Sequence, residues 1–320
     1  MSSSSTTTTT ATTTKQSVQW PVKTSEFQNA AMDSTRWNDF PFRDDDVIIA
    51  SWGKSGTTWM QQIVSQLIFN GSEDAPIHEA SPWLDLRFLP PGFATGVLEA
   101  QTHRRFIKTH SPLENLNCSP KAKYIFCARD GRDVIWSMHN HLFYATPGFY
   151  SLMNDTPGRI GHVAERPQED IRSYFHDVVE NDDRPTVTFP FWRVIRGWFA
   201  AKDTPNLLLV HFADLKKDLS GEIKRIADFL DIELTQEKLA EITSHCTFDY
   251  MKANAKKVSP EQAPLMWQNG AETFINKGTN GRWRDVLTQE DVKLYEDKAR
   301  SELGEECAKW LAEGGRVQPY

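Results

Sequence analysis

One short segment constrains the fold of this chain more than any other. It runs from Val47 to Trp59 and reads VIIASWGKSGTTW, an apolar run followed by a Gly/Ser/Thr-rich turn and the start of a helical pattern. A strand that leads through such a turn into a helix directs backbone N–H groups toward one point, and the helix dipole adds positive potential there. Lys54 adds a full charge. The segment therefore predicts a cradle for a phosphate or sulfate group.

The cradle departs from the Walker form, which needs a glycine where this chain has Ile48, inside the apolar run. Nucleoside triphosphate chemistry is therefore not the first interpretation. Trp59 lies about one turn into the helix and offers a face on which an adenine can stack, although a core aromatic would look the same.

Composition excludes several classes of protein. Of 320 residues, 39% are hydrophobic and 25% are charged, and no run approaches the roughly 18 apolar residues that a membrane span needs. The net charge of −7 argues against a nucleic-acid surface, so any anion must be held by local basic residues. We expect a protein that binds neither nucleic acid nor membrane.

Cysteine spacing and the first residues indicate where the protein resides. The cysteines show no close pairing typical of disulfides or zinc; they are Cys118, Cys127, Cys246 and Cys307. A reducing, cytoplasmic compartment is the simpler expectation. The Ser/Thr-rich start of the chain resembles neither a secretory nor a transit signal. We expect residues 1–16 to be a disordered tail and residues 17–320 to form a single domain.

Four apolar runs predict the strands of one sheet. They are Val47–Ser51, Arg105–His110, Lys123–Ala128 and Asn206–Phe212. Their alternation with helical patterns predicts an α/β fold, with a central, mostly parallel, doubly wound sheet flanked by helices. Ligands of such sheets lie beyond the carboxyl ends of the strands. Lys54, His110 and Arg129 all follow strand ends, so we expect them to lie together.

Helical patterns account for much of the rest. They cover 59–68, 134–141, 191–202, 221–230, 236–245 and 289–304. Residues 142–184 are irregular and rich in Pro, Gly and aromatic residues. This segment suits a lid over a substrate, and it equally suits an ordinary excursion with its own small cluster.

Four motifs, in this order, resemble those of the cytosolic sulfotransferases. They are Lys54–Trp59, Lys108–His110, Arg129–Ser137 and Lys277–Arg284, and the resemblance runs from about Phe42 to the end. It implies a fold akin to the P-loop nucleotide kinases. It also implies transfer of a sulfonate group from 3′-phosphoadenosine-5′-phosphosulfate (PAPS) to a small acceptor, which leaves 3′-phosphoadenosine-5′-phosphate (PAP). A sulfonate carries less charge than a terminal phosphoryl group, so lysines can replace magnesium and no metal is required.

The resemblance also implies a donor site. Arg129 and Ser137 match the family pair that holds the 3′-phosphate, although a salt bridge of Arg129 to Asp130 or Asp133 is the structural alternative. The phosphosulfate would be held by the cradle residues Lys54, Ser55, Gly56, Thr57 and Thr58. The remaining donor residues would be Trp59, Phe212, Thr247, Phe248, Asn276, Lys277 and Gly278.

The chain departs from the family pattern near its end. Asn276 stands where an arginine is usual, and Arg282 stands where an acidic residue is usual. Either Arg282 or Arg284 could supply the missing guanidinium. The C-terminal dimerisation motif of many animal members is not matched, so the oligomeric state is left open.

His110 is the predicted general base. Attack on sulfur requires the acceptor to lose its proton, and a neutral imidazole suits that step near pH 7. Lys108 shares the face of His110 on an extended strand, and both match the family's Lys-Thr-His element. Lys54 and Lys108 would neutralise charge that develops on the oxygens in the transition state.

The acceptor is expected to be a small, apolar or phenolic hydroxyl compound, with amines as the runner-up. Candidate lining residues lie near motif ends or in the proposed lid; they are Phe42, Trp83, Phe88, His139, Phe143, Tyr144, Phe149 and Tyr150. His139 and His141 would suit a metal only if the helix broke between them, so we predict no metal site.

Two other classes of function are weighed against this one. A small-molecule kinase with a degenerate phosphate loop would need magnesium, and the only carboxylate at a strand end is Asp130, beside Arg129. A non-catalytic nucleotide-binding module would be expected to have lost Lys54 or His110, and both are present. The enzyme interpretation is therefore preferred.

Overall fold

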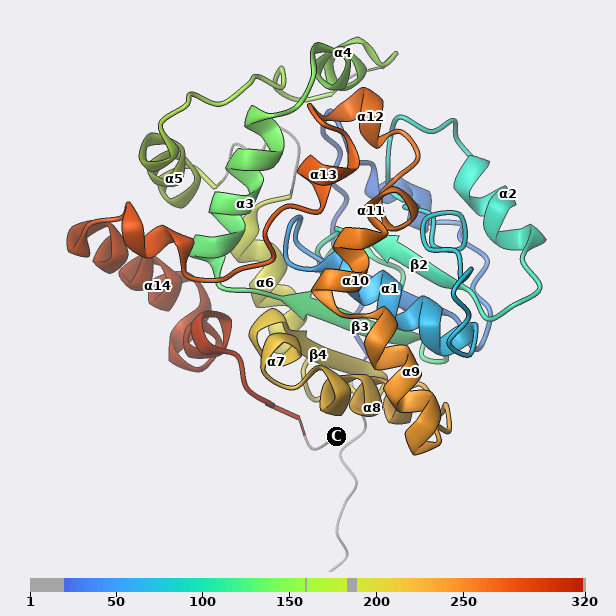
Figure 1. The fold of residues 1–320 in the computed structure, drawn as a ribbon. Helices are drawn as coiled ribbons and strands as arrows, with labels where there is room; N and C mark the ends of the chain where they lie inside the picture. Colours follow the sequence, from blue (N-terminus) through green and yellow to red (C-terminus); the bar gives the residue numbers. More distant parts are fainter. Residues whose placement is uncertain (1–19, 159, 183–188, 319–320) are drawn as a thin grey trace, which may run out of the picture.

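A parallel sheet lies at the centre of the computed structural model, which describes residues 20–158, 160–182 and 189–318 (Figure 1). Within these ranges the sheet has four strands in the order β2-β1-β3-β4, and every neighbouring pair is parallel. The strands are β1 (Val47–Ser51), β2 (Phe106–Thr109), β3 (Lys123–Ala128) and β4 (Leu207–His211). The predicted fold class is confirmed; the predicted tail, residues 1–16, lies outside the described residues.

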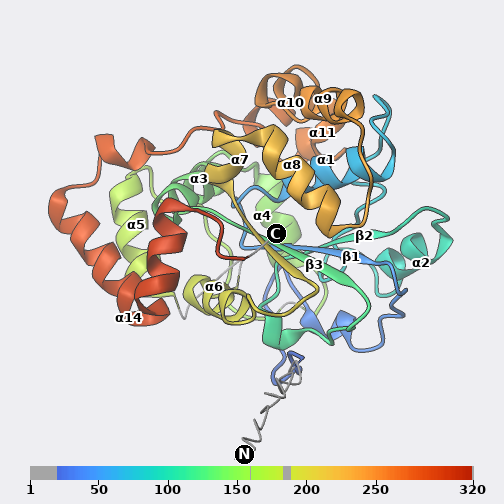
Figure 2. The same ribbon diagram turned by 90° about the horizontal axis from the view of Figure 1, so that it is seen from below.

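Both faces of the sheet are covered by helices, as the apolar runs indicate. Every residue of β1 and β4 is buried. Along β1, Ile48 and Ala50 join one apolar cluster and Val47 and Ile49 join another, as the two-residue period of a strand requires. Figure 2 shows α1 (Thr57–Ile68), α8 (Leu219–Phe229) and α9 (Gln236–His245) on one side, and α6 (Phe191–Ala200) and α14 (Gln289–Glu313) on the other.

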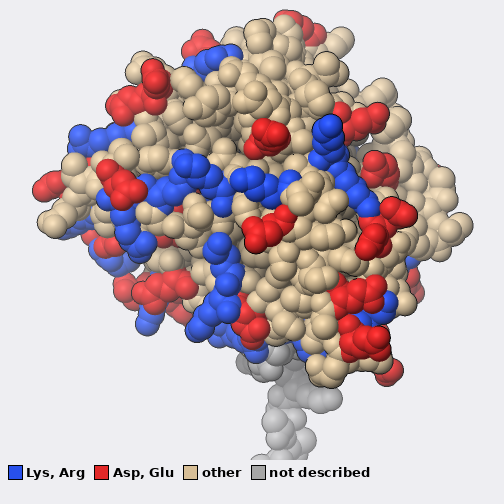
Figure 3. Space-filling model, in the orientation of Figure 1, with Lys and Arg blue, Asp and Glu red and all other residues tan. Residues whose placement is uncertain are grey.

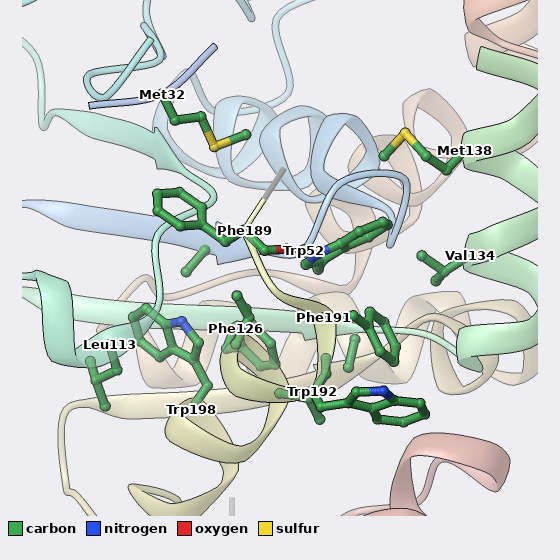
Figure 4. Close-up of a cluster of buried hydrophobic side chains, with 14 of the residues drawn as sticks. Met32, Trp52, Leu113, Phe126, Val134, Met138, Phe189, Phe191, Trp192 and Trp198 are labelled. Carbon is green, nitrogen blue, oxygen red and sulfur yellow. Dashed lines mark hydrogen bonds between the residues drawn. The ribbon is translucent and has the colours of Figure 1, made fainter. Parts of the chain in front are cut away.

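The larger cluster lies between the sheet, α3 (Gly131–Phe143) and α6 (Figure 4). Phe126 and Trp198 stack at its centre, with ring centroids 5.3 Å apart and planes 7° from parallel. Trp52, in the loop after β1, packs edge-on against Phe191 and donates its indole N–H to the Phe189 carbonyl oxygen at 2.7 Å. The core therefore anchors the loop two residues before the predicted cradle.

Residues 142–184 contain more regular structure than the sequence predicts. Within the described part of this segment are α4 (Pro147–Asp155) and α5 (Ile171–Glu180). The side chain of Thr146 caps the first, with Pro147 in its first turn, and Asp170 caps the second. These caps are local signals for the start of a helix.

The remaining elements are short and connect the layers. They are η1 (Ser34–Trp37), α2 (Phe93–Ala100), η2 (Leu113–Asn115), α7 (Phe212–Lys217), α10 (Phe248–Ala253), α11 (Ala255–Val258), α12 (Ala263–Met266), α13 (Ala271–Phe274) and η3 (Arg282–Asp285). The predicted fourth strand ends one residue early, because Phe212 begins α7. The last predicted helix continues to Glu313 across a non-helical Gly304. Among the described helices, none is long and apolar enough to cross a membrane.

Candidate functional site

The loop between β1 and α1 forms the predicted cradle. Lys54 and Gly56 have φ angles of 66° and 106°, which turn the chain sharply before the helix begins. A Cβ on Gly56 would lie 2.9 Å from the Phe212 ring, so only glycine fits there. No side chain caps the N-terminus of α1, and the buried Ser55 hydroxyl has no partner among the described residues. The uncapped N–H groups of the first turn of α1 and the Ser55 hydroxyl are therefore available to an anion.

Two partly buried lysines lie beside this turn. Burial lowers the pKa of Lys54 to about 8, and the cations Lys108 and Arg129 add to the shift. Burial also lowers the pKa of Lys108 to about 8. The Lys108 ammonium lies 4.2 Å from the centroid of the Trp83 ring, and the Lys54 ammonium lies 4.9 Å from that of Phe274. Two like charges held close together in a dry site favour an anionic ligand.

His110 is buried at the end of β2 with its tautomer set by the backbone. Its Nδ1 lies 2.6 Å from the Ser51 carbonyl oxygen, which can only accept, so Nδ1 carries the proton. Its Nε2 therefore presents a lone pair. Burial and the nearby Lys108 hold the pKa of His110 well below its usual range. The imidazole is neutral at physiological pH and has the form that a general base requires.

A pocket opens between Lys54 and the segment that links α13 to η3. Its lining joins predicted residues to others from α3 and the late segment; it comprises Lys54, Arg129, Asp133, Trp136, Ser137, Asn140, His141, Thr273, Asn276, Lys277, Gly278, Thr279 and Arg282. Figure 3 shows a band of Lys and Arg across the middle of this face, although the whole chain is acidic. Local basic residues thus supply the charge, as the composition requires.

Arg129 is held in place by the late segment and not by a carboxylate. It donates to the Asn280 side-chain oxygen at 3.0 Å and to the Thr279 carbonyl oxygen at 2.8 Å, and it lies over the Phe212 ring. Asp130 instead pairs with Arg132 at 2.9 Å. Asp133 accepts from the Gly281 N–H at 2.8 Å. Among the described residues neither acid forms an ion pair with Arg129, so the salt-bridge alternative is not realised.

The predicted adenine-side residues gather next to Arg129. Trp59 and Phe212 meet edge-to-face with centroids 5.1 Å apart, and the Trp59 indole donates to the Cys246 carbonyl oxygen at 2.7 Å. Thr247 caps α10 and Phe248 begins it. A Cβ on Gly278 would lie 2.5 Å from the Phe248 ring, so the late segment closes against this aromatic group.

The predicted acceptor residues divide into two groups. Trp83 packs edge-on against His110 with centroids 4.7 Å apart, and Phe149 lies near His141 and Trp267. The others contact neighbours elsewhere. Phe42 packs on Trp37 and Phe40, and Phe88 packs on the main core. His139 lies within hydrogen-bond distance of the Gln168 carbonyl oxygen and packs near Tyr174, and Phe143 contacts the rings of His139 and Tyr144. The Tyr150 hydroxyl donates to the Leu142 carbonyl oxygen.

Three residues near the lysines were not among the donor or acceptor residues predicted from the sequence, although His141 was considered as a metal ligand. His141 places Nδ1 3.4 Å from the Lys54 ammonium and packs on Trp267 and Phe274. Burial and Lys54 hold the pKa of His141 well below its usual range. Its spacing from Ser137, i to i+4 on one helix face, is the signal that could have found it. Trp267 and Phe274 carry no such local signal.

Of the two arginines proposed to replace the missing guanidinium, Arg282 lines the pocket, whereas Arg284 lies over Trp283.

Within the described ranges no group of three or more His, Cys, Asp or Glu residues is arranged to hold a metal ion. The residues present fit a nucleotide with phosphate groups at both ends. The unpartnered Ser55 hydroxyl and the glycine turn suit one anionic group, and Arg129, Ser137 and Lys277 suit the other.

Comparison with known proteins agrees with this geometry. The sulfotransferase domain model matches residues 44–306. A glycolipid sulfotransferase of Mycobacterium bovis is 31% identical over 314 residues, which cover 91% of this chain and 94% of the relative. Human sulfotransferase 2B1 is 28% identical over 90% of this chain and 73% of its own.

Solved structures point the same way. Mouse sulfotransferase SULT7A1 in complex with PAP has a TM-score of 0.66 over 87% of this chain and 90% of its own, with 21% identity, and shows the likeness of fold. Retinol dehydratase in complex with androsterone and PAP has a TM-score of 0.64 and 26% identity over 85% of this chain and 84% of its own. The chain therefore belongs to the sulfotransferase family and is an enzyme that uses PAPS as donor and releases PAP.

Proposed function

We propose that this enzyme transfers the sulfonate group to a hydroxyl of a small, largely apolar acceptor by in-line displacement, with His110 as general base. The observation that carries the proposal is the state of His110. Its Nδ1–H is bound to the Ser51 carbonyl oxygen and its Nε2 lone pair is unprotonated. The partly buried Lys108 lies two residues earlier in the chain, on β2.

In this proposal Nε2 of His110 accepts the proton of the acceptor hydroxyl as its oxygen attacks sulfur. Lys54 and Lys108 stabilise the negative charge that develops on the sulfonyl oxygens and on the departing phosphate oxygen. The uncapped N-terminus of α1 adds backbone donors at the same point. The donor supplies an activated sulfonate on a phosphate leaving group. Burial strengthens each of these interactions because little water competes.

For donor binding, we propose that Arg129, Ser137, Lys277 and Arg282 hold the 3′-phosphate, with Asn276 and Gly278 at the edge of the same pocket. Residues Ser55, Gly56, Thr57 and Thr58 would hold the phosphosulfate. Trp59, Phe212, Thr247 and Phe248 would surround adenine, supported by the edge-to-face pair of Trp59 and Phe212.

The aromatic wall formed by Trp83, Phe149, Trp267 and Phe274 supports an apolar or phenolic acceptor. Similarity to glycolipid sulfotransferases supports a lipid-like hydroxyl acceptor. An amine acceptor is the alternative, because a neutral imidazole accepts a proton from either. A cytoplasmic location, a single domain over residues 17–320 and the absence of membrane partners stay predictions.

Calorimetry and transfer assays test the proposal together. PAP should bind with micromolar or better affinity without magnesium, and adenosine diphosphate, which lacks the 3′-phosphate, should bind at least about tenfold more weakly. Arg129→Ala should remove that preference. His110→Asn should keep PAP affinity and lower transfer to phenol and alcohol acceptors by about 10²–10⁴-fold.

Equal or tighter binding of the diphosphate would overturn the donor assignment. Full transfer activity in His110→Asn would overturn the general base. Transfer to amines but not to hydroxyl acceptors would favour the amine-acceptor alternative.

A further inference from the structure

A carboxylate that the reaction does not need directly is buried beside the two strand-end groups. Asp85 is 0% exposed. Its oxygens accept hydrogen bonds from Thr109 Oγ1 at 2.6 Å and Trp37 Nε1 at 3.3 Å, and also from Ser111 Oγ and Trp83 Nε1. Burial raises the pKa of Asp85, and the hydrogen bonds from these four neutral donors oppose that shift by favouring the carboxylate.

We propose that Asp85 is a positioning residue for sulfonate transfer, which sets the orientation of Lys108 and His110 through Trp83 and Thr109. The proposal rests on the function proposed above. Burying a carboxylate is costly unless its hydrogen bonds and its effect on nearby charges offset the loss of solvent. Two of its four hydrogen-bond partners, Trp83 and Thr109, adjoin Lys108 and His110.

Trp83 is the first link between Asp85 and the reacting groups. Its indole N–H is bound to Asp85, which fixes the plane of the ring. The ring lies 4.2 Å from the Lys108 ammonium and meets the His110 imidazole at 86°. Backbone hydrogen bonds also keep Trp83 beside Lys108. The Lys108 N–H donates to the Pro82 carbonyl oxygen at 3.1 Å, and the Leu84 N–H donates to the Lys108 carbonyl oxygen at 3.3 Å. A rotation of the indole would therefore disturb both reacting groups.

Thr109 is the second link. It stands between Lys108 and His110, and its buried hydroxyl donates to Asp85 while accepting from the Ser111 N–H at 3.0 Å. These bonds fix the backbone where β2 ends and His110 begins. Asp85 thus accepts hydrogen bonds from the residues on both sides of His110, which are Thr109 and Ser111.

Charge reinforces this geometry. Among the described residues, the titratable groups that interact electrostatically with Lys108 are Asp85, Lys54, His78, His110 and His141. Asp85 is the anion in this set, and it raises the pKa of Lys108 against the effect of burial. Loss of the Asp85 charge should therefore lower the pKa of Lys108 and remove the ammonium charge at a lower pH.

The test is the nearly isosteric Asp85→Asn variant. Its kcat should fall by about 10–100-fold, with PAP affinity within about twofold of the parent. The alkaline limb of kcat should move to lower pH by about one pH unit. The pKa of Lys108 should fall by a similar amount, read from the pH dependence of its acetylation by acetic anhydride and mass spectrometry of the peptide. Asp85→Glu should restore the position of the limb.

Asp182→Asn is the matched control. Burial raises the pKa of Asp182 as well, to about 6, and this carboxylate caps α6 through the Phe191 and Trp192 N–H groups, away from the lysines. This variant should move neither the alkaline limb nor the acetylation of Lys108. Equal shifts in both variants, or an unshifted Lys108 in Asp85→Asn, would overturn the proposal.

The acetylation measurement needs no acceptor, so it tests the role of Asp85 even if no transfer is detected and the proposed function fails. Should Asp85→Asn not fold, Trp83→Phe and Thr109→Val each remove one donor to Asp85 and keep a similar shape. Each should lower kcat by about three- to tenfold with PAP affinity kept. Unchanged kcat in both would overturn the positioning role.

Discussion

Lys54 and Lys108 are partly buried at the proposed anion site, and burial lowers the pKa of each to about 8. At pH 8 each side chain is therefore about half protonated in the free protein. An anion beside an ammonium group favours its charged form, so donor or product binding must raise both pKa values. The charge that the site offers is thus coupled to the ligand that it binds.

PAP binding at pH 8 should take up about one proton in total from the buffer, about half a proton at each lysine. Binding at pH 7 should take up far fewer protons, because both side chains are already charged there. Calorimetry in buffers of different ionisation enthalpy gives the number directly. Lys108→Met should remove about half of the uptake at pH 8. A binding enthalpy that is independent of buffer at pH 8 would contradict the coupling.

At the scale of elements, the proposed donor site depends on two glycines, each of which lies against an aromatic ring where one element connects to the next. Gly56 joins β1 to α1 against Phe212, and Gly278 lies between α13 and η3 against Phe248. Both have positive φ angles. A side chain at either position would move the backbone of the proposed donor site away from the aromatic group beside it.

Gly278→Ala should weaken PAP binding by at least about tenfold, because its Cβ would lie 2.5 Å from the Phe248 ring in addition to the backbone strain. Gly92→Ala is the matched control. Gly92 also has a positive φ, of 80°, but nothing lies within 4 Å of its Cβ position. That variant should lose about 1 kcal/mol of stability and keep PAP affinity. Calorimetry and thermal unfolding measure both quantities, and equal loss of affinity in the two variants would contradict the steric argument.

At the scale of the molecule, the end of the described chain returns to the edge of the sheet. The Gln318 side chain accepts from the Leu209 N–H at 2.7 Å and donates to the Leu207 carbonyl oxygen at 2.7 Å. It also donates to the Lys202 carbonyl oxygen at 2.6 Å. One amide side chain thus satisfies backbone groups of β4 that no neighbouring strand pairs, and ties the C-terminal segment to the core.

Gln318→Ala should lower the free energy of unfolding by about 1–3 kcal/mol, because it leaves buried backbone groups of β4 without partners. Gln236→Ala, at an exposed position in the first turn of α9, should change it by less than about 0.5 kcal/mol. Urea denaturation followed by fluorescence gives both values. If the two variants unfold at the same urea concentration, the edge contact contributes nothing measurable.

Much of the site could be predicted from the sequence because its signals are local. The run Val47–Ser51 and the run Lys123–Ala128 are strands with the predicted bounds, and polar residues do follow the strand ends. The predicted turn at Lys54 and Gly56 and the helix that follows it are present, because turn residues and helix starts act over a few positions. The fold class, the family and the donor were all within reach of such patterns.

Only the tertiary structure decided which distant residues meet. The strand order β2-β1-β3-β4, the choice of Arg282 over Arg284 at the pocket, and the place of His141 beside Lys54 depend on packing between segments far apart in the chain. Asp85 shows the reason most clearly. Whether a carboxylate is a solvated surface group or a buried charge beside Lys108 is set by what covers it, and those neighbours come from separate parts of the sequence.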